Sequence, residues 1–296
     1  MCLGYMLGSA FTRETALQIV QQLPLMVVTT VLTIAVALWC GVLTARHART
    51  DMMSGLFGSV PGGLSQMLVI SEEIEGIEAT VVVLMQTIRV LAVVFFVPFL
   101  AIHGIGDGTA DSLPPSSPNP HTDGLLWYQY ILYAAIPFLG AWIGKRIHLP
   151  NSILAGPLLA IAVVVVIGKQ EAPPLPVPLI LLSQLAIGIN IGLQVKPDML
   201  KNAKLSAYSI GGSLVLLLFS LLLAFGLTMI TPMTLTTAFL STAPGGIAEM
   251  GVTAKMVHAD LSMVSGYHLF RIFFIMFFVP PLLQWWVRKR EKKHSF

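Results

Sequence analysis

Long apolar stretches constrain this chain more than any other feature of its sequence. A helix needs about 20 consecutive apolar residues to cross the hydrocarbon core of a bilayer. One cleaved signal peptide accounts for a single such stretch, and only 10% of the 296 residues are charged, against about a quarter in soluble domains. The sequence therefore predicts a multi-pass membrane protein in contact with the lipid bilayer. The clearest spans are residues 23–44, 77–101, 125–144, 205–230 and 261–285.

A helix-breaking phrase occurs twice within these apolar surroundings. "PGGLSQM" fills residues 61–67 and "PGGIAEM" fills residues 244–250. An arginine follows each phrase inside the next apolar stretch, Arg89 in the first copy and Arg271 in the second. A further proline lies nine residues beyond each arginine. This shared order and spacing indicates an internal repeat.

The repeat divides the chain into four parts. Residues 1–102 form the first transmembrane copy and residues 125–287 the second. Residues 103–124 are rich in Pro, Gly, Ser and Asp, which is typical of an aqueous linker, here on the extracytoplasmic side. Residues 288–296 form a basic cytoplasmic tail. Because only the second copy has two apolar segments in front of its paired glycines, the first copy is expected to lack its N-terminal hairpin.

The loops rich in Lys and Arg indicate how the two copies are oriented. These loops all fall in the cytoplasm if one segment of each copy, such as the PGG segment, enters and leaves the membrane on the same side. Each copy then crosses the membrane an odd number of times, which inverts one copy relative to the other. The expected fold class is all-α: a polytopic transmembrane helical bundle with two inverted repeats and interrupted helices. Secondary transporters commonly have this arrangement.

An interrupted helix survives in a membrane only where protein or a wet cavity surrounds the break. The half-helix after each break presents free N–H groups and a positive dipole end, which favour an anion. The alternative is that each break is a kink that allows close helix packing. We expect both breaks, their polar neighbours and the two arginines to form the substrate-binding site: Pro61, Gly62, Gly63, Ser65, Gln66, Arg89, Pro244, Gly245, Gly246, Glu249 and Arg271.

Arg89 and Arg271 lie midway along their apolar stretches, where an unpaired guanidinium is costly. Either the arginines hold an anionic substrate through bidentate contacts, or they pair with a nearby carboxylate or with helix-end carbonyls. The second copy also carries two titratable residues, Glu249 and His268, where the first has glutamines. We expect Glu249 and His268 to couple transport to protons. The alternative is that Glu249 only neutralises Arg271.

Several classes of site have no support in the sequence. The histidines are scattered without ligand spacing and the two cysteines, Cys2 and Cys40, lie in apolar sequence, so we expect no catalytic site, metal or cofactor. No segment between spans is long enough for a DNA-reading domain, so we expect no nucleic-acid partner. A homo-oligomer is left open. Gly188 and Gly192, four residues apart, predict tight helix packing.

The chain resembles the AbrB family of integral membrane proteins, which contain an AbrB duplication unit. The resemblance rests on the doubled PGG-x-[SA]-[QE]-M pattern, the later arginine and proline, and "LPNSILAGPLL" at residues 149–159, and it covers nearly the whole chain. It implies a duplicated bundle distantly related to cation–proton antiporters and bile-acid-type transporters. Members are often labelled regulators of gene expression, and some carry the label ammonia monooxygenase. The small soluble DNA-binding AbrB is a different protein.

These observations together favour one function and leave a second open. The favoured function is a secondary transporter of a small, anionic solute in the cytoplasmic membrane, with no enzymatic activity. The alternative is a membrane-bound sensor that binds a metabolite and acts indirectly on gene expression through a partner.

Overall fold

The computed structural model describes residues 1–62, 77–105, 127–149, 151–168, 172–194 and 202–294. Every regular element in these ranges is a helix, which confirms the all-α fold class. Among the described residues, four stretches are long and apolar enough to cross a membrane, in agreement with a membrane protein. They are α3 (Leu23–Ala48), α6 (Ala79–Phe99) with the π-helical turn η1 (Leu100–Gly104), α10 (Ala203–Ile230), and Leu261–Val279 of α13 (Leu261–His294).

A short helix precedes the break in each copy of the repeat. These helices are α4 (Met52–Ser59) and α11 (Leu235–Thr242), and both contain eight residues. Each begins after a side chain that accepts from the first free N–H groups: Asp51 accepts from the backbone of Met53 at 2.7 Å, and Thr234 accepts from that of Thr237 at 3.2 Å. The two copies therefore start their broken helices with the same capping device.

The prolines of the two breaks explain why both short helices end where they do. Proline restricts the preceding residue to extended conformations. Val60 adopts φ −62° and ψ 130°, and Ala243 adopts φ −55° and ψ 137°. In the second copy the chain resumes as α12 (Ile247–Met256) after Gly246. The matching half-helix of the first copy falls in residues 63–76, outside the described residues.

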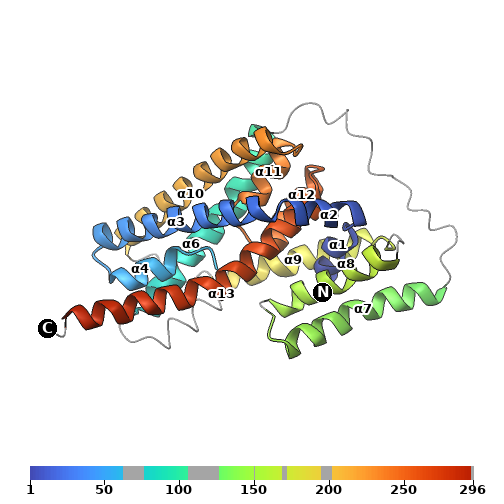
Figure 1. The fold of residues 1–296 in the computed structure, drawn as a ribbon, viewed down its shortest axis with the longest axis horizontal. Helices are drawn as coiled ribbons and strands as arrows, with labels where there is room; N and C mark the ends of the chain where they lie inside the picture. Colours follow the sequence, from blue (N-terminus) through green and yellow to red (C-terminus); the bar gives the residue numbers. More distant parts are fainter. Residues whose placement is uncertain (63–76, 106–126, 150, 169–171, 195–201, 295–296) are drawn as a thin grey trace.

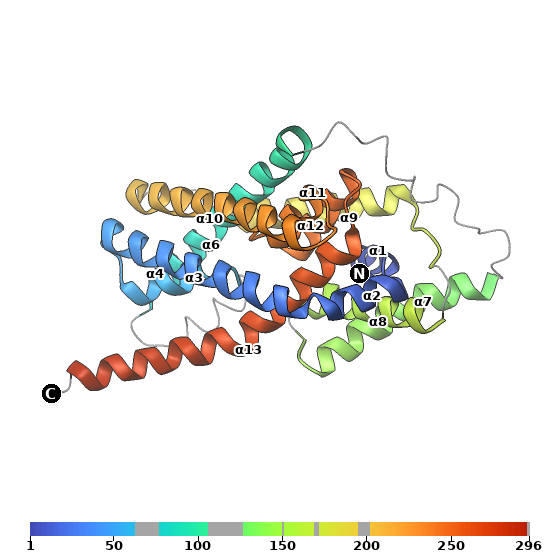
Figure 2. The same ribbon diagram turned by 45° about the horizontal axis from the view of Figure 1, so that its top comes forward.

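Helices of the two copies pack across one another instead of forming separate bundles. α10 packs against α3 and α6 of the first copy. α3 and α10 run side by side in opposite directions, and α6 and α13 also point opposite ways (Figures 1 and 2). Opposite directions are what inverted copies would have, while the placement of the copies in a bilayer stays a prediction. At the N-terminus, α1 (Cys2–Ser9) packs against α8 (Ser152–Gly168) of the second copy.

Equivalent glycines at the front of the two copies have different surroundings. In α1, a Cβ atom on Gly4 would lie 2.5 Å from the Leu154 carbonyl oxygen of α8, and one on Gly8 would lie 2.5 Å from the Leu158 oxygen. The small residues allow this close helix contact. Gly188 and Gly192 in α9 (Val177–Gln194) have no atom within 4 Å of that position. The predicted tight packing at Gly188 and Gly192 is wrong because no described helix crosses that face of α9.

The remaining described helices, α2 and α7, lie near α1 and α8. α2 (Arg13–Gln21) follows α1 and has no buried residue. α7 (Trp127–Arg146) forms a hairpin with α8 (Figure 1). Of the predicted linker at 103–124, only its first three residues, 103–105, are described.

Candidate functional site

The two breaks have the same backbone geometry. In the first, the N–H of Gly62 donates to the Val60 carbonyl at 2.8 Å, and in the second the N–H of Gly245 donates to the Ala243 carbonyl at 2.8 Å. Each bond closes a three-residue turn around the buried proline, Pro61 or Pro244. Gly63, Ser65 and Gln66 of the predicted site lie outside the described residues.

The second break lies directly against α6 of the first copy. A Cβ atom on Gly245 would lie 2.9 Å from Cγ1 of Val93, one helical turn beyond Arg89. A side chain at this position would force Val93 or Met250 to shift, so the close packing of the break against α6 favours glycine here. The structure thus brings together the second break and the α6 segment that carries Arg89.

Arg271 binds the carbonyl groups at the end of α11. Its Nη1 atom donates to the Ala243 oxygen at 2.6 Å and reaches the Thr242 oxygen at 3.5 Å, and its Nη2 atom donates to the Gly245 oxygen at 2.6 Å. The negative end of a helix dipole lies at these carbonyls. Of the two sequence-based alternatives, the structure shows contacts with helix-end carbonyls, and Nε of Arg271 remains without a partner.

Arg89 binds the end of α4 in the same way. Its Nη1 atom donates to the Ser59 oxygen at 3.1 Å and to the Val60 oxygen at 2.8 Å. Its Nη2 atom donates to the side-chain oxygen of Gln86, whose amide nitrogen in turn donates to the oxygens of Val60 and Phe57. The Nε atom of Arg89 is buried without a partner, like that of Arg271.

The two guanidinium groups leave an excess of positive charge inside the protein. Arg89 is 5% exposed and Arg271 is 4% exposed. Neither makes a salt bridge with a described residue, and they lie close enough to feel each other's charge. Each helix C-terminus supplies about half a negative charge, so two such ends offset about one of the two positive charges. Apart from Glu249, the two arginines are thus left with about one uncompensated positive charge.

Glu249 lies in the first turn of α12, next to the second break. A Cβ atom on Gly246 would collide with its carboxylate, which shows that the side chain folds back over the helix N-terminus. One carboxylate oxygen, Oε2, is buried without a hydrogen-bond partner. Glu249 makes no ion pair with Arg271. Its carboxylate lies at the N-terminus of α12, where the sequence predicts an anion to bind.

His268 lies one turn before Arg271 on α13 and is fully buried. Its Nδ1 atom lies 2.9 Å from the Val264 carbonyl oxygen. Because a carbonyl only accepts, Nδ1 carries the proton and Nε2 is left with a free lone pair and no partner. The equivalent residue of the first copy, Gln86, donates its amide nitrogen to two carbonyls and accepts from Arg89, so the two copies differ at this position.

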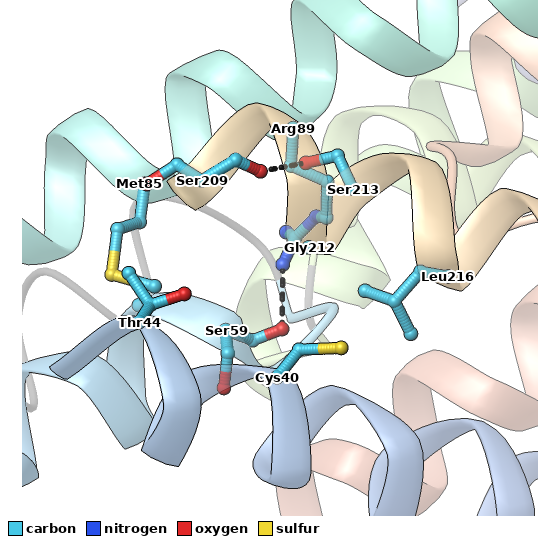
Figure 3. A pocket seen from close by; sticks show the side chains of 10 residues that line it. Cys40, Thr44, Ser59, Met85, Arg89, Ser209, Gly212, Ser213 and Leu216 are labelled. Carbon is cyan, nitrogen blue, oxygen red and sulfur yellow. Dashed lines mark hydrogen bonds between the residues drawn. The ribbon is translucent and has the colours of Figure 1, made fainter. Parts of the chain in front are cut away.

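A small pocket beside Arg89 contains residues that the sequence reasoning missed (Figure 3). It has a volume of about 20 Å³ and lies between α3, α4, α6 and α10. A signal existed in the sequence, because buried serines recur along one face of α10 at helical spacing. The pocket is lined by Cys40, Thr44, Gly58, Ser59, Met85, Arg89, Ser209, Gly212, Ser213 and Leu216.

Comparison with known proteins places the chain in context. A family model described as "Transition state regulatory protein AbrB" matches residues 1–287. The protein YhjN of Bacillus subtilis (strain 168) is 31% identical over 281 residues, which cover 90% of this chain and 72% of YhjN. A protein of Escherichia coli (strain K12) called "Putative regulator AbrB" is 26% identical over 290 residues, 95% of this chain and 79% of that protein. No solved structure matches the chain to a significant degree.

Proposed function

Because the chain belongs to the AbrB family of membrane proteins, we propose that it is a secondary carrier of a small anionic solute. The solute binds between the two breaks, near Arg89 and Arg271, and the protein resides in the cytoplasmic membrane as a multi-pass carrier. The proposal includes neither an enzymatic reaction nor a nucleic-acid partner.

The uncompensated charge of the two arginines is the observation that carries this proposal. Both guanidiniums are buried, neither forms a salt bridge with a described residue, and each donates its Nη atoms to the end of a broken helix. Charges inside a membrane protein are expensive and mark solute pathways where they lack a structural counter-ion. A cation would be repelled by the pair, whereas an anion would reduce their mutual repulsion.

Glu249 offers a physical route to proton coupling. Its carboxylate lies at the N-terminus of α12, the same positive dipole end that attracts a solute anion. Two carboxylates at this end repel each other, so solute binding favours a proton on Glu249. Uptake of one anion would then bring in one proton, and we propose that His268, buried on the neighbouring helix α13, exchanges that proton.

Flux through reconstituted protein tests the proposal. Purified protein in liposomes would be given radiolabelled formate, acetate, lactate and succinate, with and without an inward proton gradient. We expect gradient-stimulated uptake of at least one of these anions over protein-free liposomes. Glu249→Gln should retain exchange of that anion across the membrane but lose stimulation by the gradient. Uptake of none of the four by folded wild-type protein would contradict the proposal.

The name of the Escherichia coli relative favours a second candidate, a membrane-bound sensor that acts indirectly on gene expression. A sensor would use the same buried arginines to bind its anion but would not move it. Binding without flux in the same liposomes would therefore support the sensor and refute the carrier.

A further inference from the structure

The pocket beside Arg89, called the Arg89 pocket below, lies where helices of the two copies meet. α3, α4 and α6 of the first copy supply three of its walls, and α10 of the second copy supplies the fourth. Arg89 is the single charged residue among those that line it. Its guanidinium lies between Ser213 of α10 and Ser59 of α4 (Figure 3). The pocket is therefore positive and closed on the α10 side by the second copy.

Two hydrogen-bond donors in the Arg89 pocket have no partner in the described structure. Nε of Arg89 is buried and unpaired. The hydroxyl of Thr44 makes no hydrogen bond with a described residue, and Thr44 as a whole is 3% exposed. A buried donor left without an acceptor is costly, so Nε of Arg89 favours a bound acceptor, and the free Thr44 hydroxyl can donate to the same acceptor.

Three serine hydroxyls can add to these donors. Those of Ser59, Ser209 and Ser213 each donate to a carbonyl of their own helix, at 2.9, 2.7 and 2.8 Å. Each of these carbonyls can also accept a hydrogen bond from a backbone N–H of its helix. The carbonyl therefore does not depend on the serine hydroxyl. The hydroxyls can thus rotate toward a bound anion without leaving a backbone group unsatisfied.

The volume of the Arg89 pocket limits what it can hold. It measures about 20 Å³, far less than the cavity of about 150 Å³ that is known to bind a benzene ring. A sugar, an aromatic acid or a phosphate ester does not fit. One guanidinium with hydroxyl donors suits a single negative charge, and a divalent anion would need a second cation.

We propose that the Arg89 pocket binds the charged head of the transported solute, and that this head is a compact monovalent anion no larger than a carboxylate group. Nε of Arg89 and the Thr44 hydroxyl hold the anion, and the serine hydroxyls complete its shell. This inference rests on the proposed function, because it specifies where and how that carrier binds its solute. It adds Thr44, Ser209 and Ser213 to the solute site.

Cys40 can report occupancy of the Arg89 pocket, because Cys40 lines the pocket and is 5% exposed. In a Cys2→Ser background, Cys40 is the single remaining cysteine. Its rate of modification by a small methanethiosulfonate would be measured by mass spectrometry with added formate, chloride or sulfate at equal ionic strength. We expect formate to slow the reaction several-fold and saturably, and sulfate to have no effect. Protection by chloride alone would identify a halide site and overturn the carboxylate head.

Two variants on the same helix sharpen the test. Thr44→Val removes the free hydroxyl at nearly constant shape and should weaken formate protection about tenfold, the loss of one strong hydrogen bond. Thr33→Val is the matched control, because the Thr33 hydroxyl donates to the Thr29 carbonyl at 2.7 Å, away from the pocket. Equal protection in Thr44→Val and wild type would overturn the proposal.

Failure of the pocket and failure of the carrier have different signatures. Anion flux without protection of Cys40 overturns the pocket and leaves the carrier standing. Protection of Cys40 without flux supports the pocket as a binding site and refutes transport. If the thiol does not react at all, the same formate titration is read from the melting temperature, where a rise in wild type but not in Thr44→Val supports the proposal and no rise overturns it.

Discussion

Replacing Arg271 separates its structural role from its role toward a solute. In Arg271→Met, the apolar part of the side chain is kept but the carbonyls of Ala243 and Gly245 lose their donors, both now at 2.6 Å. A hydrogen bond to a charged group contributes about 1.5–3 kcal/mol, so two of them amount to about 3–6 kcal/mol. The third contact, 3.5 Å to the Thr242 oxygen, is at the limit for a hydrogen bond and adds little.

This loss converts into a melting temperature that can be measured in detergent. For a chain of this size about 1 kcal/mol corresponds to roughly 2 °C, so Arg271→Met should melt about 6–12 °C below wild type. Arg271→Lys keeps the charge and can satisfy one carbonyl, and should lose about half as much. Arg46→Met is the control, because this exposed arginine of α3 makes no hydrogen bond or ion pair with a described residue.

The melting temperatures decide between the two roles. If Arg271→Met melts within about 2 °C of the Arg46→Met control, the carbonyl contacts do not hold the break together, and the reasoning from helix-end geometry is refuted. If the protein is destabilised as expected, loss of solute binding in Arg271→Met cannot be assigned to a direct contact. Arg271→Lys then becomes the variant in which to measure binding.

Three further predictions follow from the same structure. Gly8→Ala would place a methyl group 2.5 Å from the Leu158 oxygen and should lower the free energy of unfolding by about 1–3 kcal/mol. Gly192→Ala, at the equivalent open position, should leave that free energy unchanged or raise it by up to about 1 kcal/mol. Chemical unfolding measures both. Asp51→Ala and Thr234→Ala should each cost about 0.5–2 kcal/mol in the same assay, because each removes the cap of a short helix. Glu249→Gln should abolish the dependence of solute uptake on external pH while preserving counterflow; unchanged pH dependence would remove Glu249 from the coupling step.

The outline of the fold was predictable because it depends on local sequence. Apolar stretches predicted the helices α3, α6, α10 and α13, and Pro61 and Pro244 predicted where α4 and α11 end. The partners of the arginines were not predictable. Sequence reasoning left carboxylate, helix-end carbonyl and substrate open for both Arg89 and Arg271, since the choice depends on which backbone atoms lie within about 3 Å after packing.

The sequence alone determined the features that depend on neighbouring residues in the chain. These are the apolar segments of a membrane protein, a repeated order of motifs, and two helix breaks that are each followed by an arginine. The tertiary structure decided everything that requires distant segments to meet. It placed Thr44 of α3 and Ser213 of α10 in one pocket with Arg89, folded Glu249 over the start of α12, and covered Gly8 with α8 while leaving Gly192 bare. Proline restricts the dihedral angles of its own residue and of the residue before it, so its effect can be read from the sequence. A contact between distant segments depends on how whole helices cross, which neither copy of the repeat encodes by itself.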